Sequence, residues 1–390
     1  LRLQVEHCVT EEVSGIDLVE WMVRLAAGEP LPLADHVHQP RGHAIEARIY
    51  AENPAKDFQP STGLLTNVQF PDGVRVDTWV ESGTEVSAFY DPMIAKVIAH
   101  APTRDEAIAK LRHALVESRL DGIETNQAYV AAILGDPTFQ TGGMTTRYLS
   151  AFVFQPQTVD VLEPGTQTTV QDFPGRLGYW AVGVPPSGPM DPLAFRLANR
   201  ILGNPPDAAG LELTMSGPTL RFNAPARICL GGAHMPATLD GAPVEYWTAI
   251  DVDTGQVLRI GNVSGPGVRT YLAFAGGLDV PDYLGSKSTF SLGGFGGHGG
   301  RPLRAGDVLR LTPDFPREAQ NDDLPDFDYP ISNSWTLGVL YGPHGAPDFF
   351  TDEDIATLFD TDYEVHYNSN RTGVRLIGPK PKWARKDGGE

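Results

Sequence analysis

The stretch His43-Ala44-Ile45-Glu46-Ala47-Arg48-Ile49-Tyr50 alternates apolar and polar side chains along most of its length. Successive side chains of a strand point to opposite faces, so this alternation predicts a half-buried β-strand. Glu46, Arg48 and Tyr50 would share one face, and the isoleucine and alanine side chains would share the other. We therefore expect a sheet with one apolar face and one face that carries charged groups.

A second stretch, Arg2-Leu3-Gln4-Val5-Glu6-His7, alternates in the same way and predicts another strand, with its arginine, glutamine and glutamate on one side. Alternation alone fits an edge strand with a solvated polar face equally well. Two arginines and a glutamate on neighbouring strands suit a small planar anion, because a guanidinium pairs with a carboxylate-like group and a glutamate accepts a proton. Carboxylate, bicarbonate and phosphate all fit this description.

Length, charge and cysteine content limit the class of protein. The 390 residues predict two or three domains, and 41% hydrophobic residues allow sizeable cores. A formal charge of -19 disfavours nucleic acid and anionic membranes as partners. No apolar run of about 18 residues and no signal peptide occur, and the two cysteines, Cys8 and Cys229, lie far apart. We expect a soluble, cytoplasmic protein without disulfides, and an internal fragment, since the chain starts without Met inside an expected strand.

Metal and nucleotide signatures are incomplete. His36 and His38 alternate as metal ligands do, but no third ligand stands near them, so solvated loop histidines are the better interpretation. Residues 293–300 contain a literal GxGxxG, yet no helix pattern follows and Pro302 intervenes. We therefore predict no metal site, and a turned loop instead of a phosphate-binding loop.

Three helices have clear signals. Apolar spacing predicts one from about residue 16 to 27, capped by Ser14 or Gly15, and a capping box predicts another from Thr103 to Glu117. Asp191 as N-cap with Pro192 at the first position predicts a third, with Asn199 off its buried stripe. The expected buried stripes are Leu18, Trp21, Met22, Leu25 and Ala26; Ala107, Leu111, Ala114 and Leu115; and Leu193, Leu197, Ala198 and Ile201.

The composition changes near residue 155, where glycine and proline become frequent and a mostly β region begins. Residues 255–260 and 306–311 repeat a turn followed by a strand, as in a small closed barrel. Residues 314–330 are acidic and proline-rich, which is typical of a linker. We expect domains at 1–152 and 159–390 joined by 153–158, the second divided into 159–313 and 331–390. Within the last part we expect a strand at 336–341, a helix at 351–358 and a hairpin at 363–377.

Motifs in the first region closely resemble, in order and spacing, the C-terminal part of the biotin carboxylase domain of biotin-dependent carboxylases; they lie at residues 2–11, 42–52, 58–63, 90–96 and 121–126. The resemblance implies an α+β domain in which Arg2 and Arg48 face bicarbonate and the ureido group of biotin. It also implies that Gln4 and the Val5 backbone bind bicarbonate and that Glu6 is the base. In the family, the ATP and Mg²⁺ ligands lie mostly upstream of this stretch. Cys8 stands where the family usually has proline.

Motifs in the second region resemble the carboxyltransferase domain of the urea carboxylase family, shared with the 5-oxoprolinase-like group; they lie at 171–176, 183–191, 198–199, 211–212, 239–241, 271–277 and 284–289. The resemblance implies two cyclophilin-like barrel halves with the active site between them, of which this chain holds the first and part of the second. It implies a substrate pocket formed by Gln171, Asp172, Arg176, Ser187 and Asp191. Turn chemistry, with Asp191 only capping its helix, explains the same residues equally well.

The order of the two regions is that of urea carboxylases. The resemblance implies a ligase that carboxylates biotin with ATP and bicarbonate and transfers the carboxyl group to urea, giving allophanate. Biotin would sit on a carrier domain outside this chain, with Mg²⁺ accompanying ATP, and the chain alone is expected to be inactive. Guanidine or another urea-like amide is an alternative acceptor. A non-catalytic binding or regulatory module of the 5-oxoprolinase-like group is an alternative class.

Overall fold

The computed structural model describes residues 3–31, 39–312, 329–369, 371 and 373–386. Arg2, His36, His38 and nearly all of the expected acidic linker lie outside these residues. The chain forms two compact units, residues 1–329 and 330–390. Within the larger unit we call residues 1–152 the first region and residues 159–312 the second region. No helix in the described part of the chain has the length and apolar character needed to cross a bilayer.

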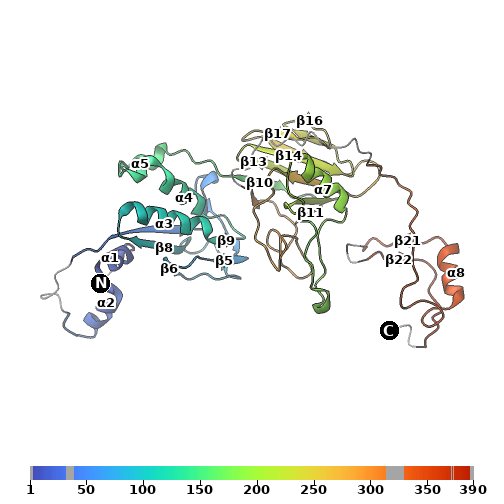
Figure 1. Cartoon of the computed structure of the whole chain (residues 1–390), viewed down its shortest axis with the longest axis horizontal. Helices are drawn as coiled ribbons and strands as arrows, with labels where there is room; N and C mark the ends of the chain where they lie inside the picture. Colours follow the sequence, from blue (N-terminus) through green and yellow to red (C-terminus); the bar gives the residue numbers. More distant parts are fainter. Residues whose placement is uncertain (1–2, 32–38, 313–328, 370, 372, 387–390) are drawn as a thin grey trace. The chain divides into compact units, whose positions relative to one another are not determined.

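The first region is built on a three-stranded antiparallel sheet in the order β1 (His43–Tyr50), β8 (Met93–Ala101), β6 (Arg75–Thr78). Helix α3 (Arg104–Glu117) covers one face, which carries Ala47, Ile49 and Val97 into a common core (Figure 1). The predicted strand and its apolar face are thus confirmed. The Thr103 capping box and the four-residue buried stripe of α3 are confirmed as well.

Shorter elements complete the first region. Three two-stranded ribbons pair β2 with β3, β4 with β7, and β5 with β9. The bounds of these elements are β2 (Glu52–Asn53), η1 (Pro54–Lys56), β3 (Gln59–Pro60), β4 (Gly63–Leu64), β5 (Asn67–Gln69), β7 (Glu85–Val86), β9 (Arg119–Asp121), α4 (Gln127–Gly135), α5 (Pro137–Gln140) and α6 (Tyr148–Ala151).

The predicted opening strand is wrong for its described residues. Residues 3–6 form no strand, and α1 (His7–Ser14) begins where the strand should continue. The amide of His7 donates to the Gln4 carbonyl at 3.1 Å, and the amide of Val9 donates to the Glu6 carbonyl at 3.0 Å. These local bonds turn the backbone into a helix, because a strand needs a neighbour to take up its amides and carbonyls.

Helix α2 (Leu18–Ala26) forms where predicted, but its cap is Asp17, whose side chain accepts a hydrogen bond from the Glu20 amide. The expectation that its apolar stripe is core is wrong: none of its residues is buried, and Leu25 of that stripe is 46% exposed. The helical period identifies which face is apolar. It does not determine what covers that face.

The second region contains two antiparallel sheets, of six strands (β16-β15-β18-β13-β10-β20) and five strands (β11-β12-β19-β14-β17). They enclose one apolar core to which both contribute, including Val159, Leu220, Leu211 and Leu272. The strands are β10 (Thr158–Glu163), β11 (Gln167–Gln171), β12 (Gly210–Thr214), β13 (Thr219–Phe222), β14 (Ala226–Gly232), β15 (Ala237–Leu239), β16 (Ala242–Pro243), β17 (Ile250–Val252), β18 (Val257–Ile260), β19 (Arg269–Phe274) and β20 (Val308–Arg310). Neither sheet closes on itself among the described strands, so the closed barrel stays a prediction.

Helix α7 (Pro192–Ile201) follows the long loop that carries η2 (Trp180–Val182). Asp191 caps it, as predicted: the Ala194 amide donates to Asp191 Oδ1 at 3.0 Å. The predicted stripe is partly wrong, because Leu193 is 56% exposed and Asn199 is fully buried. Asn199 is tolerated inside because its amide donates to the Ala208 carbonyl and its oxygen accepts from Asn204.

The glycine-rich segment 293–300 is a compact turn, closed by bridging of Phe290 and Phe295 and followed by no helix. This agrees with the predicted turned loop. The smaller unit holds α8 (Asp352–Asp360) and a hairpin of β21 (Glu364–Val365) and β22 (Leu376–Ile377), both as predicted. The strand expected at 336–341 is wrong, since these residues have no regular structure.

Candidate functional site

The polar face of the first sheet carries charged groups in register across its three strands. Arg48 on β1 lies opposite Lys96 on β8, and Lys96 lies opposite Asp77 on β6. Helix α1 lies on this face, because its Cys8 contacts Glu46 and Lys96 from that side. Strand register therefore places a row of two cations and one carboxylate, Arg48, Lys96 and Asp77, beneath the first helix.

Arg48 connects the sheet to the residues that precede α1. Its Nε donates to Glu46 Oε1 at 2.9 Å, and its Nη2 forms an ion pair with Glu6 Oε1. The Arg48 side chain is 34% exposed and that of Glu6 is 60% exposed, whereas Glu46 is almost fully buried. The structure thus brings two predicted site residues, Glu6 and Arg48, into direct contact at an open surface.

The network continues through buried groups behind this pair. The Cys8 thiol donates to Glu46 Oε2, and Lys96 Nζ lies 3.8 Å from Cys8 Sγ and 3.1 Å from Asp77 Oδ2. Arg75 Nε donates to Asp77 Oδ1 at 2.9 Å. Charges therefore alternate in sign from Glu6 to Asp77, which fixes the Arg48 guanidinium from behind.

This environment shifts the pKa values of several groups, among them Glu6, Cys8 and Asp77. A backbone hydrogen bond, and then the hydrogen bond from Arg48, lower the pKa of Glu6, so it is a carboxylate at neutral pH. Burial and the neighbouring Glu46 raise the pKa of the Cys8 thiol to about 11. Burial alone would raise the pKa of Asp77, but the ion pairs with Arg75 and Lys96 outweigh it and lower it. The site thus presents a charged base beside a fixed guanidinium.

The other predicted residues of this site make fewer contacts that bear on its chemistry. Gln4 offers its carbonyl to the ring Nδ1 of His7, 2.8 Å away, and Val5 is 38% exposed just before the helix. Arg2 lies outside the described residues. Sequence reasoning left Lys96 and Glu46 out of the site, although both lie within the motifs of the first region and hold its central groups.

In the second region, the carboxylate of Asp172 accepts hydrogen bonds from the loop of residues 286–288. Its Oδ1 accepts from the hydroxyls of Ser286, at 2.6 Å, and of Ser288, and its Oδ2 accepts from the Lys287 amide at 2.9 Å. Only 7% of Asp172 is exposed. Both oxygens of its carboxylate are therefore already hydrogen-bonded to the loop.

Arg176 binds the same loop from another side. Its Nε donates to the Tyr283 carbonyl at 2.8 Å and its Nη2 donates to the Ser288 carbonyl at 2.9 Å, while the guanidinium stacks on Phe295. The side chain is fully buried, and burial lowers its pKa. Asp172 and Arg176 thus share partners in residues 286–288 of the 284–289 motif, and Arg176 also binds the Tyr283 carbonyl. The sequence identified this motif but did not connect it with either residue.

The three remaining predicted residues of the second region differ in their contacts; they are Ser187, Gln171 and Asp191. The Arg176 amide donates to the Pro186 carbonyl at 2.6 Å, which places Ser187 beside the 172–176 loop. The half-buried Ser187 hydroxyl has no hydrogen-bond partner among the described residues. Gln171 is buried, and its side-chain oxygen is likewise unpaired there. Asp191 caps α7.

The turn before α7 depends on a buried glutamate that the prediction did not include. Glu212 Oε2 accepts from the Met190 amide at 2.8 Å and from the Tyr271 hydroxyl at 3.0 Å. Tyr271 in turn accepts from the Asp191 amide at 2.7 Å. The Leu211-Glu212 pair of the sequence motif therefore supports the loop that carries Ser187 and Asp191.

Family models match most of the chain. The model of the carboxyltransferase domain, subdomain A and B, matches residues 182–389, more than half of the chain. The biotin carboxylase C-terminal domain matches residues 46–151. The ATP-binding domain of the carbamoyl-phosphate synthase L chain matches residues 1–34.

Relatives match over nearly the whole chain. A urea amidolyase of Lachancea kluyveri is 50% identical over 402 residues, covering 100% of this chain and 22% of the relative. A putative urea carboxylase of Emericella nidulans is 44% identical, covering 100% of this chain and 32% of the relative. The crystal structure of the Kluyveromyces lactis urea carboxylase superposes with a TM-score of 0.89 at 47% identity, covering 98% of this chain and 35% of that chain. The chain thus spans about a third or less of the length of these relatives.

Proposed function

Because the chain belongs to the family of carboxyltransferase domains with subdomains A and B, we propose that it is part of an ATP- and biotin-dependent urea carboxylase. The observation that carries this proposal is the full-chain identity to proteins named urea amidolyase and urea carboxylase. Bicarbonate, urea and a biotinylated carrier would be its partners. The two free thiols support a cytoplasmic location.

In the first region, the exposed edge of Arg48 and the carboxylate of Glu6 fit bicarbonate and a ureido oxygen. When bound, biotin would carry the carboxyl group between the two sites. Glu6 would take the bicarbonate proton on its carboxylate oxygen, and Arg48 would stabilise the negative charge that develops on the ureido oxygen. Arg2, Gln4 and the Val5 backbone would bind the anion.

The described residues alone do not form a Mg²⁺ site. No group of three or more His, Cys, Asp or Glu side chains suited to a metal ion occurs among them. In the biotin carboxylase family, the ligands of ATP and Mg²⁺ lie mostly upstream of the stretch that residues 2–11 resemble, and we propose the same arrangement for the protein that carries this chain.

In the second region we assign the five predicted residues two kinds of role. Ser187 and Gln171 would meet the acceptor, since the Ser187 hydroxyl and the Gln171 side-chain oxygen have no partner among the described residues. Asp172 and Arg176 would hold the 283–288 loop, and Asp191 the start of α7, at the edge of the pocket. The shared core of the two sheets supports a barrel half.

We also propose the domain limits 1–152 and 159–390, with halves at 159–313 and 331–390. Three observations support them. The biotin carboxylase model ends at residue 151. The two regions have separate apolar cores. The compact units part between residues 329 and 330.

The test is turnover by the full-length protein that carries this chain. With bicarbonate and the biotinylated carrier present, urea should stimulate ATP hydrolysis and allophanate should accumulate in step with ADP. Stimulation by guanidine and not by urea would show that the acceptor is guanidine instead of urea. Stimulation by neither would favour a binding module and overturn the proposal.

A further inference from the structure

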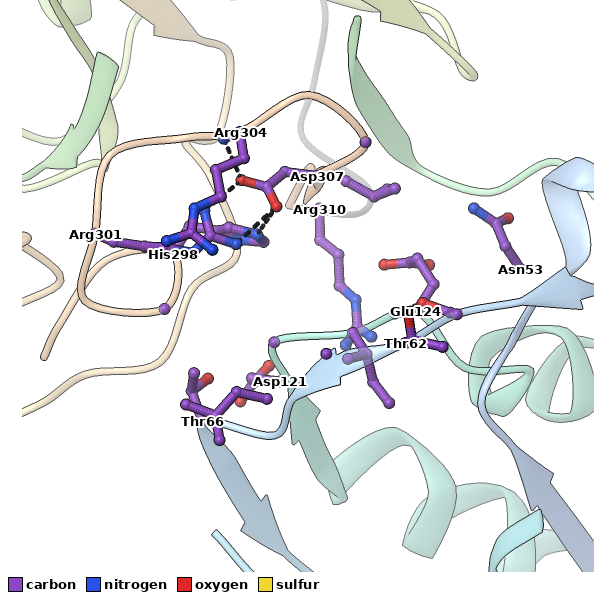
Figure 2. A pocket seen from close by; sticks show the side chains of 18 of the residues that line it. Asn53, Thr62, Thr66, Asp121, Glu124, His298, Arg301, Arg304, Asp307 and Arg310 are labelled. Carbon is purple, nitrogen blue, oxygen red and sulfur yellow. Dashed lines mark hydrogen bonds and ion pairs between the residues drawn. The ribbon is translucent and has the colours of Figure 1, made fainter. Parts of the chain in front are cut away.

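A polar cleft of about 620 Å³ lies between the first and the second region, and none of the predicted site residues lines it (Figure 2). Residues 53–66 and 121–124 form one wall, and residues 279–281 and 297–310 form the other. Such a cavity has the size of a small-molecule site. It is therefore a second place, apart from the proposed catalytic groups, where this chain can hold a ligand.

Ion pairs beside the cleft tie its two walls together. Arg119 Nη1 lies 3.1 Å from Asp279 Oδ1, and Lys56 Nζ lies 3.8 Å from Asp160 Oδ2. In each pair, one partner belongs to the first region and the other to the second. The cleft is thus framed by contacts within one compact unit.

Several charges in the second wall already have partners. Arg301 donates from Nη1 and Nη2 to the two oxygens of Asp307 at 2.7 and 2.8 Å. His298 Nε2 lies 3.6 Å from Asp307, and the Arg304 amide donates to it at 2.7 Å. Asp307 is saturated by these contacts, so it offers nothing to a ligand.

The remaining charges face each other unpaired. The guanidinium groups of Arg304 and Arg310 make no hydrogen bond or ion pair with another described residue, nor does the carboxylate of Glu124. Asp121 accepts only from Asn67 Nδ2, at 3.2 Å. Figure 2 shows Arg310 extending from β20 into the cleft, toward the wall that carries Asp121 and Glu124. One wall therefore offers cations and the other offers carboxylates.

Burial disfavours the charged form of the carboxyl groups of Glu124 and Asp121. It raises the pKa of both groups, and the nearby positive charge of Arg310 only partly offsets this rise. A buried charge is costly until it is paired, so a positively charged group placed between the two acids would be held strongly. An anion placed at the two arginines would meet one exposed guanidinium, that of Arg304, and one half-buried guanidinium, that of Arg310.

Two glycines of the glycine-rich segment line this cleft. Gly297 and Gly299 have φ of 57° and 67°, a conformation that favours glycine. A Cβ on Gly297 would meet Thr289 Oγ1 at 2.0 Å, and one on Gly299 would lie 3.6 Å from Thr66 Cγ2. The turn thus brings the backbone beside His298 close to the opposite wall.

We propose that this cleft binds a small zwitterion of the amino-acid class, with its carboxylate on Arg304 and Arg310 and its ammonium group on Asp121 and Glu124. A simple anion would meet the two carboxylates, and a simple cation would meet the two arginines. A zwitterion satisfies both walls. Because its contacts come from both regions, its binding would link them. This inference does not depend on the proposed carboxylase activity.

The first test uses the unaltered chain. The twenty amino acids are screened by thermal shift, and the one that raises Tm most is compared by calorimetry with its des-amino acid and its decarboxylated amine. Each single-charge analogue should bind at least about tenfold more weakly, a loss of about 1.4 kcal/mol. Equal binding by either analogue, or no binding by any amino acid, overturns the proposal.

The second test changes each wall. Arg310→Met and Glu124→Gln should each weaken amino-acid binding by about tenfold. Arg259→Met, on the exposed side of β18 in the same sheet, and Glu81→Gln, an exposed glutamate of the first region, are matched controls that should bind normally. Undiminished binding by both cleft variants overturns the proposal. If a cleft variant fails to fold, the analogue series on the unaltered chain still decides.

Discussion

The two proposed sites use charged side chains in opposite ways. In the first region, Glu6 and Arg48 form an ion pair that is largely open to solvent. In the second, Asp172 and Arg176 are buried and bonded to one loop. Exposed ion pairs contribute roughly 0–1 kcal/mol, whereas removing one partner of a buried, hydrogen-bonded charge costs several times more. The contrast separates groups free to meet a ligand from groups that hold the backbone.

The largest expected effect is on activity, from the exposed pair. Arg48→Ala in the full-length protein should abolish biotin-dependent ATP turnover, because the charge on the ureido oxygen loses its cation. The free energy of unfolding should fall by about 1 to 3 kcal/mol, because the half-buried Arg48 also pairs with the buried Glu46, and the chain should stay folded. Arg24→Ala is the matched control: Arg24 is also exposed and pairs with Glu20 and Glu29. Turnover that persists in Arg48→Ala would show that the site is assigned wrongly.

The next largest effect is on the free energy of unfolding, and it comes from the buried hydrogen bonds of Asp172. Asp172→Ala leaves three donors of residues 286–288 without their acceptor and should lower the free energy of unfolding by about 3 kcal/mol. The denaturation midpoint of the second region reports this change. Asp253→Ala, at an exposed aspartate, should stay within about 0.5 kcal/mol. If both variants unfold alike, Asp172 faces the substrate instead of holding the loop.

The smallest effect concerns protonation of Glu6. Its pKa is lower in the folded chain than its ordinary value, so the ionised form adds stability above that value. This contribution is lost as the pH falls through the folded pKa, below about 4.5. Arg48→Ala should raise the Glu6 pKa part of the way, since the backbone hydrogen bond remains. Carboxyl NMR titration measures it, with Arg24→Ala as the variant in which Glu6 should not shift.

Local patterns predicted elements whose partners are nearby or whose signals are self-contained. Strand β1 and helix α3 each carry their own period and, for α3, its own cap. The opening stretch had a strand pattern but no strand beside it, so local bonds made it helical. For α2 and α7 the period was right, but burial depends on what lies next to each helix: α2 buries none of its residues, and α7 buries a face that includes Asn199.

The candidate sites follow the same rule. The alternation of β1 was enough to place Glu46 and Arg48 on one face. The bond between Arg48 and Glu6 spans 42 positions, and those of Asp172 with Ser286 and Ser288 span 114 and 116. Contacts so distant in sequence leave no local trace, so the role of Asp172 in holding a loop was visible only in three dimensions.

The thiols of both cysteines of the chain are expected to react slowly. Cys8 lies wedged between Glu46 and Lys96, and burial raises the thiol pKa to about 11 for Cys8 and about 12 for Cys229. Alkylating reagents attack the thiolate, which is scarce at neutral pH for both groups. A cysteine introduced on an exposed wall of the cleft would therefore react selectively. Spectroscopic labels can be attached there without first removing the native thiols.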